Sequence, residues 1–109
     1  MYGSPDFERI KDLVISTIPM VESIFLFGSQ ASRGTAHEQS DIDIAVLLER
    51  ELQWRERNRF LNRLYSETAP KGYNVDFVLK SADKFRTQSE LPTLSRVILR
   101  GGRLLWTKS

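Results

Sequence analysis

The sequence predicts an α/β sandwich, in which helices pack on a small β-sheet, and two observations lead to this prediction. Segments with an apolar residue at every third or fourth position alternate along the chain with short runs of β-branched and aromatic residues, patterns typical of helices and strands respectively. The chain has 109 residues, of which 40% are hydrophobic, and this is enough for one core but not for two. Residues 1–109 are therefore expected to form a single domain with the element order α-β-α-β-α-β-α.

The first half of the chain carries the signals of one helix and two strands. Ser4, which a proline follows, is typical of a helix start, and apolar residues recur at helical spacing from there to Pro19. Residues 22–27 (ESIFLF) form a short apolar run that a glycine closes, which predicts a buried strand. Residues 28–41 are a polar loop in which a helix could begin. Residues 42–48 alternate but are apolar on both faces after their second position, so we expect a central strand there.

The second half predicts two helices around a third strand. Residues 49–68 have helical apolar spacing and end before Pro70, which favours an amphipathic helix. Residues 73–79 (YNVDFVL) alternate as a strand does. Apolar spacing at 94–98 predicts a last helix that two glycines end, and residues 104–106 are expected to form a short strand or a packed tail.

Charge and composition exclude several functional classes. Sixteen Lys and Arg against fourteen Asp and Glu leave a net charge of only +2, so no broad cationic surface is expected and nucleic acid is not expected as the main ligand. The chain has no cysteine, which excludes disulfides and thiolate metal sites and fits a cytoplasmic address. No apolar run approaches the roughly 20 residues of a membrane span, and the amino end has no secretory pattern.

Charged side chains dominate the helix expected at residues 49–68. Its arginines are interleaved with glutamates, and mixed signs of this kind favour a solvated face. Trp54 and Phe60 lie among them. Both could belong to the core or to a surface that binds a partner, and we expect the core.

Gly28 and Ser29 directly follow the strand expected at residues 22–27. The missing side chain of the glycine lets another group approach the backbone, and amides at a helix start, together with the serine hydroxyl, can donate to phosphate oxygens. A Gly-Ser pair is also common in ordinary turns. By itself, the pair therefore leaves open an anion site and a simple turn.

Asp41 and Asp43 are separated by one residue, so in an extended chain their side chains leave the same face. Two carboxylates at such close range repel each other unless a cation neutralises them, and magnesium is commonly held by one or two carboxylates and substrate phosphates. The alternative is that Ser40 and Asp41 cap the loop while Asp43 lies at a solvated strand edge.

Asp76 is expected in the middle of an otherwise apolar strand, where an unpaired charge would cost several kcal/mol. If this strand lies beside residues 42–48, Asp41, Asp43 and Asp76 form a cluster that faces the Gly-Ser pair. The alternative is an exposed edge strand on which Asp76 lies beside an arginine or a lysine.

These residues together resemble a known family. Its motif is matched by Gly28-Ser29, Arg33-Gly34, Ser40-Asp41-Ile42-Asp43-Ile44 and the later Asp76. The combination resembles the minimal nucleotidyltransferase (MNT) group of the DNA polymerase beta-like nucleotidyltransferase superfamily, over almost the whole chain. The resemblance implies the fold of that superfamily, a small mixed sheet flanked by helices. The chain differs from the family at one place, because residues 30–40 number eleven where the family usually has ten.

The resemblance also implies an activity, a cofactor and a set of residues. The implied reaction is the magnesium-dependent transfer of a nucleoside monophosphate, AMP from ATP by preference, to a hydroxyl acceptor. The residues that it implies for nucleotide binding are Gly28, Ser29, Arg33 and Ser40. The residues that it implies for catalysis and for ligating two magnesium ions are Asp41, Asp43 and Asp76.

The small size of the chain leaves little material for an acceptor site, so a second protein or a second subunit is expected to complete it. The resemblance implies a helical HEPN-type partner and a role as the antitoxin of a HEPN/MNT toxin–antitoxin pair. Two alternatives stay open. The chain could be a binding module that neutralises a partner by contact alone, or the nucleotide-binding half of a small-molecule (aminoglycoside-type) nucleotidyltransferase.

Overall fold

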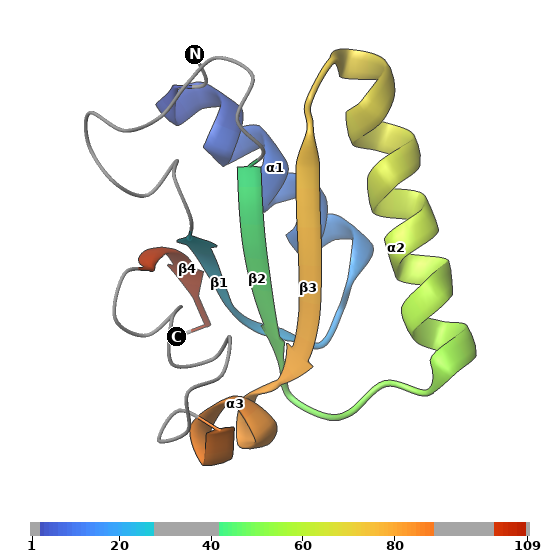
Figure 1. The fold of residues 1–109 in the computed structure, drawn as a ribbon, viewed down its shortest axis with the longest axis vertical. Helices are drawn as coiled ribbons and strands as arrows, with labels where there is room; N and C mark the ends of the chain where they lie inside the picture. Colours follow the sequence, from blue (N-terminus) through green and yellow to red (C-terminus); the bar gives the residue numbers. More distant parts are fainter. Residues whose placement is uncertain (1–2, 28–41, 89–101, 109) are drawn as a thin grey trace.

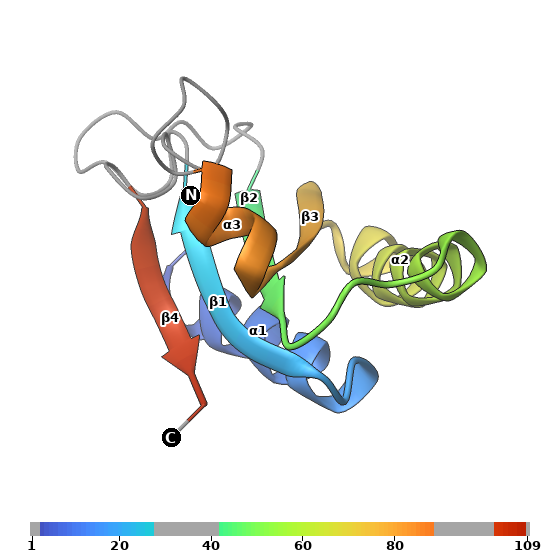
Figure 2. The same cartoon turned by 90° about the horizontal axis from the view of Figure 1, so that it is seen from below.

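The computed structural model describes residues 3–27, 42–88 and 102–108. Four strands form one sheet, two long helices cover one of its faces, and a short helix packs on the opposite face (Figures 1 and 2). The expected α/β architecture with a small mixed sheet is thus confirmed. None of the helices in the described ranges has the length and apolar character needed to cross a bilayer.

The first helix, α1, runs from Ser4 to Thr17 as predicted. The carboxylate of Asp6 accepts the Gly3 backbone N–H at 2.8 Å, which satisfies a donor that the first turn leaves open. The same carboxylate accepts the hydroxyl of Tyr73 at 2.8 Å. The start of α1 is therefore tied to the chain just before the third strand.

The sheet has the strand order β3-β2-β1-β4. Strand β1 (Val21–Phe27) is antiparallel to β2 (Ile42–Leu48) and to β4 (Arg103–Thr107), whereas β3 (Val75–Ser81) is parallel to β2. The predicted central position of β2 is confirmed. Of the two structures expected for residues 104–106, a short strand or a packed tail, the strand is present, as part of β4.

The second helix, α2, runs from Trp54 to Thr68, so it begins five residues later than predicted. A short 3-10 helix, η2 (Ala69–Lys71), follows it and ends at Gly72, whose φ of 83° suits a residue without a Cβ atom.

Of the two aromatic residues of α2 expected in the core, Phe60 packs against it. The prediction for Trp54 was wrong, since its side chain is 74% exposed. Trp54 lies ten positions before the buried Leu64, so its side chain points about a quarter turn away from the buried face of α2.

The short helix α3 (Ala82–Gln88) was not predicted. The hydroxyl of Ser81 accepts the Lys84 backbone N–H at 3.2 Å and so caps its first turn, which also contains Asp83. A serine followed by an acidic residue is a helix-start signal that the sequence contains. The predicted helix at residues 94–98, and the one that could begin in the loop 28–41, lie outside the described residues.

Apolar side chains fill both faces of the sheet. The larger cluster lies between the sheet and the pair α1 and α2 and includes the fully buried Ile44 and Val46. The smaller cluster lies on the other face, where the ring of Phe25 stacks on that of Phe85 from α3 at 6.1 Å. Strand β2 contributes to both clusters, which explains why both of its faces are apolar.

Helix α2 also covers the outer edge of β3. The hydroxyl of Tyr65 accepts the Phe77 backbone N–H at 3.1 Å, and the guanidinium of Arg57 donates to the Leu79 carbonyl oxygen. These two side chains take the place of a further strand, because each satisfies a backbone group that an edge strand would otherwise offer to another chain.

We expect Tyr65→Phe to lower the free energy of unfolding by about 1 kcal/mol, because the variant keeps the ring contact with Phe77 but loses the acceptor for its N–H. Urea unfolding followed by circular dichroism measures this change. Ser66→Ala, an exposed change on the same helix, is the control and should change the stability by less than about 0.5 kcal/mol. Equal stability of Tyr65→Phe and the wild type would contradict the role of the hydroxyl.

The pKa of Asp6 lies below its ordinary 3.8, first because of the Gly3 N–H and then because of the Tyr73 hydroxyl. A depressed pKa contributes stability above the unfolded-state value, and this is lost as the pH falls through the folded-state value. Asp6→Asn should therefore be less stable than the wild type at pH 7, and the gap should narrow once the pH falls below 3.8. Thermal unfolding at a series of pH values tests this, with Asp12→Asn as the exposed control on the same helix. A gap that stays constant with pH would refute the assignment.

Candidate functional site

A row of three residues crosses the sheet at the end where β2 and β3 begin. Phe27 of β1 pairs in register with Asp43 of β2, and Asp43 pairs with Asp76 of β3. Paired positions on neighbouring strands project to the same face of a sheet, with the strands about 4.8 Å apart. The two aspartate side chains therefore project side by side from the face opposite α1 and α2.

The alternation of polar and apolar residues explains why this row forms. Ile42 and Ile44, on either side of Asp43, are fully buried in the larger cluster, so the carboxylate must leave the other face. The Ile42 backbone N–H donates to the Asn74 carbonyl oxygen at 2.8 Å, which fixes the two strand starts against each other. Asp43 is half-buried and Asp76 is exposed.

The structure corrects one part of the reasoning about Asp76. This residue is the second of β3, on an edge strand of the described sheet, and its side chain is exposed. It does not occupy a buried mid-strand position, so the desolvation cost expected from the sequence does not apply. Exposure was the alternative interpretation, but the neighbour in register is Asp43 rather than a cation. The pairing with Asp43, and not burial, is what brings the two carboxylates together.

The layer below the row is apolar. Phe25, Ala45 and Val78 form the next row on this face, and Phe85 of α3 packs against it. Lys80 lies four residues from Asp76 along β3, about 13 Å at the rise of a strand. Burial, and then the nearby Lys84, lower the pKa of Lys80. The two carboxylates thus lie beside a packed apolar layer, and the ammonium group of Lys80 is too far along β3 to pair with Asp76.

The remaining predicted site residues lie in residues 28–41, outside the described part of the chain: Gly28, Ser29, Arg33, Ser40 and Asp41. The chain leaves β1 at Phe27 and enters β2 at Ile42, so this segment is joined at both ends to the part of the sheet that carries Asp43. Asp41 immediately precedes β2 in the sequence.

The donor set suits a divalent cation with a preference for oxygen ligands. Two neighbouring carboxylates are the ligands that magnesium takes in phosphate-transfer sites. Within the described ranges, no three acidic or histidine side chains gather in one place, and Asp41, the third predicted ligand, lies outside those ranges. Sequence reasoning overlooked Phe27 as part of this row, because an apolar residue at a strand end carries no signal beyond burial.

A comparison with protein families identifies the family to which the chain belongs. The family model "Polymerase beta, Nucleotidyltransferase" matches residues 8–109, nearly the whole chain. The chain belongs to the polymerase beta nucleotidyltransferase family. The resemblance to its minimal nucleotidyltransferase group is confirmed by a relative of that kind.

That relative is the protein adenylyltransferase MntA of Shewanella oneidensis, which is 34% identical over 103 residues, 90% of this chain and 63% of its own length. The chain therefore spans less than two thirds of this curated relative. A crystal structure of a toxin–antitoxin complex with AMP-PNP contains a similar chain, with 32% identity and a TM-score of 0.66 over 94% of this chain and 73% of the other. A structure of a tri-AMPylated Shewanella oneidensis HEPN toxin with its MNT antitoxin matches with 25% identity and a TM-score of 0.55, over 93% and 69%.

We expect Asp43→Asn and Asp76→Asn each to weaken the binding of Mn²⁺ at least tenfold, because each removes one charged oxygen ligand from the pair. Titration calorimetry with Mn²⁺ in place of magnesium measures this. Glu8→Gln on α1, an exposed change of the same kind in the other layer, is the control and should bind as the wild type does. Wild-type affinity in Asp76→Asn would show that Asp76 is not a ligand.

Proposed function

We propose that this chain is a magnesium-dependent nucleotidyltransferase that transfers AMP from ATP to a hydroxyl group of a partner protein, as the antitoxin of a HEPN/MNT toxin–antitoxin pair in the cytoplasm. The observation that carries the proposal is the register that places Asp43 beside Asp76. Membership of the family supports the reaction type. The names of the relatives, an adenylyltransferase and an AMPylated toxin bound to its antitoxin, support the choice of AMP and of a protein acceptor.

The proposed reaction is a displacement at phosphorus. The acceptor oxygen forms a bond to the α-phosphorus of ATP, the bond from that phosphorus to the oxygen that bridges to the β-phosphorus breaks, and pyrophosphate leaves. The hydroxyl proton passes to solvent. Magnesium ions, when bound, neutralise charge on the attacking and leaving oxygens.

The residues of the chain bind and orient the reactants. Asp41, Asp43 and Asp76 would hold the magnesium ions. The packed row of Phe25, Ala45 and Val78 beneath Asp43 and Asp76 limits the movement of these two carboxylates. The triphosphate would be held by backbone amides and side chains of residues 28–40, with Gly28, Ser29 and Ser40 as donors and Arg33 as a cation.

The second candidate is a binding module that neutralises its partner by contact alone. The eleven residues between Ser29 and Asp41, one more than the family usually has, favour it, because phosphate binding depends on the length of that segment. The two candidates differ in what they require. A catalyst needs the aspartates and ATP, whereas a contact module needs neither.

Incubation of the protein and a candidate HEPN-type partner with ATP labelled at the α-phosphate tests the proposal. We expect label on the partner, none when the label is at the γ-phosphate, and a loss of roughly a hundredfold or more in Asp43→Asn, since charge stabilisation at the reacting phosphate is lost. Glu8→Gln should transfer as the wild type does. Equal transfer by Asp43→Asn would refute the catalytic role of Asp43. No transfer from a stable wild-type complex would favour the contact module.

A further inference from the structure

A groove follows the seam between α1 and α2, on the layer opposite the carboxylate row. A hollow of about 410 Å³ at one end reaches Lys71 and Tyr73, and a second of about 480 Å³ at the other end reaches Phe60. The two hollows share Leu13, Ser16 and Glu67, so they form one continuous groove, which we call the α1–α2 groove.

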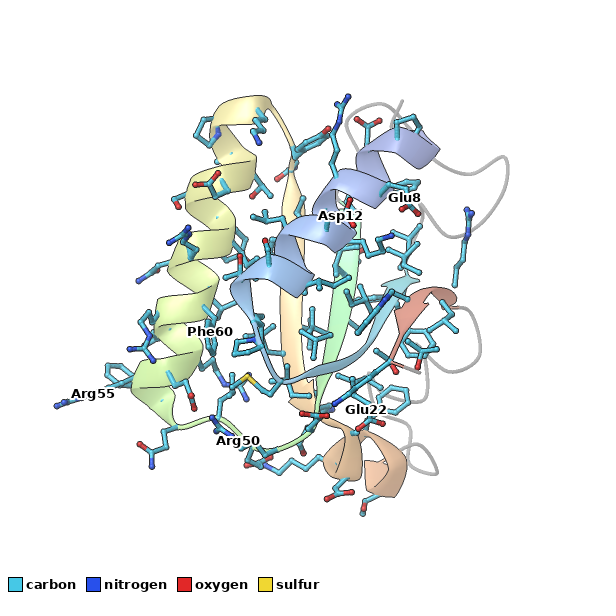
Figure 3. The ribbon with its side chains drawn as sticks, turned by 180° about the vertical axis from the view of Figure 1, so that it is seen from behind. Glu8, Asp12, Glu22, Arg50, Arg55 and Phe60 are labelled. Atoms are coloured by element: carbon cyan, nitrogen blue, oxygen red, sulfur yellow. The ribbon has the colours of Figure 1, made fainter. Side chains whose placement is uncertain are left out.

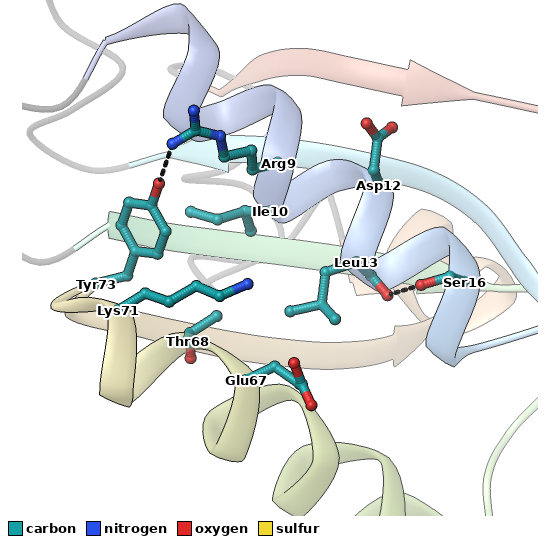
Figure 4. Close-up of a pocket in the computed structure, with 9 residues that line it drawn as sticks. All are labelled: Arg9, Ile10, Asp12, Leu13, Ser16, Glu67, Thr68, Lys71 and Tyr73. Atoms are coloured by element: carbon teal, nitrogen blue, oxygen red, sulfur yellow. Dashed lines mark hydrogen bonds between the residues drawn. The ribbon is translucent and has the colours of Figure 1, made fainter.

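The floor of the α1–α2 groove is apolar. Figure 4 shows Ile10 and Leu13 of α1 on one side of the hollow and Thr68 of α2 on the other. Further along the seam, Phe60 lies on the side of α2 that faces α1, whereas Arg55 points away from the groove (Figure 3). Ile10 and Thr68 are buried, whereas Leu13 and Phe60 are only half-buried. Leu13 and Phe60 therefore offer apolar surface to an incoming chain.

The rim of the α1–α2 groove carries an excess of positive charge. Four cationic side chains line it, namely Arg9, Arg59, Arg63 and Lys71, against the two acidic side chains of Asp12 and Glu67. Neither Arg59 nor Arg63 forms an ion pair with another described residue. An apolar floor between cationic rims is complementary to a segment that is apolar on one side and acidic on its flanks.

The dimensions of the groove favour a helix as that segment. The part of α2 that lines it runs from Arg59 to Thr68, about 14 Å at the rise of an α-helix. This length matches between two and three turns of another helix, and helices commonly bind in this way with their apolar face in a groove between two others. A nucleic acid fits the groove less well, because Asp12 and Glu67 would repel its phosphates. The apolar floor would also have no apolar partner in the nucleic-acid backbone.

We propose that the α1–α2 groove is the docking site for an acidic amphipathic helix of the partner protein. The inference rests on the proposed function for the existence of a partner, and adds the surface and the kind of segment that binds it. One end of the groove reaches Tyr73, three residues before Asp76. A partner seated there has one end close to the part of the sheet that carries the candidate active site.

The probe is a fluorescein-labelled synthetic peptide of about 15 residues with leucines at helical spacing and flanking glutamates, and its control carries lysine at each glutamate position. We expect the acidic peptide to bind at least tenfold more tightly, measured by fluorescence anisotropy without ATP or metal. Arg63→Glu should weaken its binding at least tenfold. Arg55→Glu, the same charge change on the outward side of the same helix, should not.

A steric pair of variants tests the position of the peptide. Ser16 lines both hollows and Ser66 lines neither, yet each is exposed and each hydroxyl donates to the carbonyl oxygen three residues before it. Ser16→Trp should abolish peptide binding and Ser66→Trp should preserve it, with circular dichroism confirming that both are folded. Equal binding by both variants would overturn the proposal.

Other occupants give different results. Binding of a DNA oligonucleotide that depends on Arg63, with no binding of the acidic peptide, would overturn the proposal in favour of nucleic acid. Self-association that Ser16→Trp abolishes, again with no peptide binding, would overturn it in favour of a second copy of this chain. Asp43→Asn should bind the peptide as the wild type does. Peptide binding by a wild-type protein that transfers no AMP would contradict the catalytic proposal alone, whereas AMP transfer by a wild-type protein that does not bind the peptide would contradict this one alone.

Discussion

The parallel pairing of β2 with β3 is the constraint on which the candidate site depends. Asp43 and Asp76 are far apart in the sequence, and only the register of these two strands makes them neighbours. A slip of one residue would turn every side chain of β3 to the other face and would bury Asp76 while exposing Phe77. The apolar residues of the larger cluster oppose such a slip, so the core that stabilises the fold also fixes the position of the carboxylates.

The two faces of the sheet have different roles, one in stability and the other in the candidate site. The face under α1 and α2 holds most of the core, whereas the opposite face carries the carboxylate row on a smaller apolar layer beside α3. The outer edge of β3 would be vulnerable to pairing with another chain, but Tyr65 and Arg57 of α2 occupy its backbone groups. These two contacts therefore oppose the pairing of the outer edge of β3 with another chain.

The proposed docking groove and the candidate active site lie on opposite layers but approach each other at one end of the molecule. The connection is the short segment between α2 and β3, in which Lys71 and Tyr73 line the groove and which enters β3 just before Asp76. The hydrogen bond from Tyr73 to Asp6 fixes this segment against α1. A partner held in the groove would thus be held on a rigid part of the fold, which is what the alignment of an acceptor group requires.

By itself, the sequence determined the fold class, the central position of β2, the face on which each residue of β3 lies and the family motif, because alternation, glycine and proline positions and motif spacing are local properties. Only the tertiary structure decided that Asp76 is exposed at a strand start and that its neighbour is Asp43, since strand order and register depend on contacts between distant segments. The same holds for Trp54, whose exposure follows from how α2 packs. The groove between α1 and α2 could not be predicted either, because it exists only where two helices distant in sequence lie side by side.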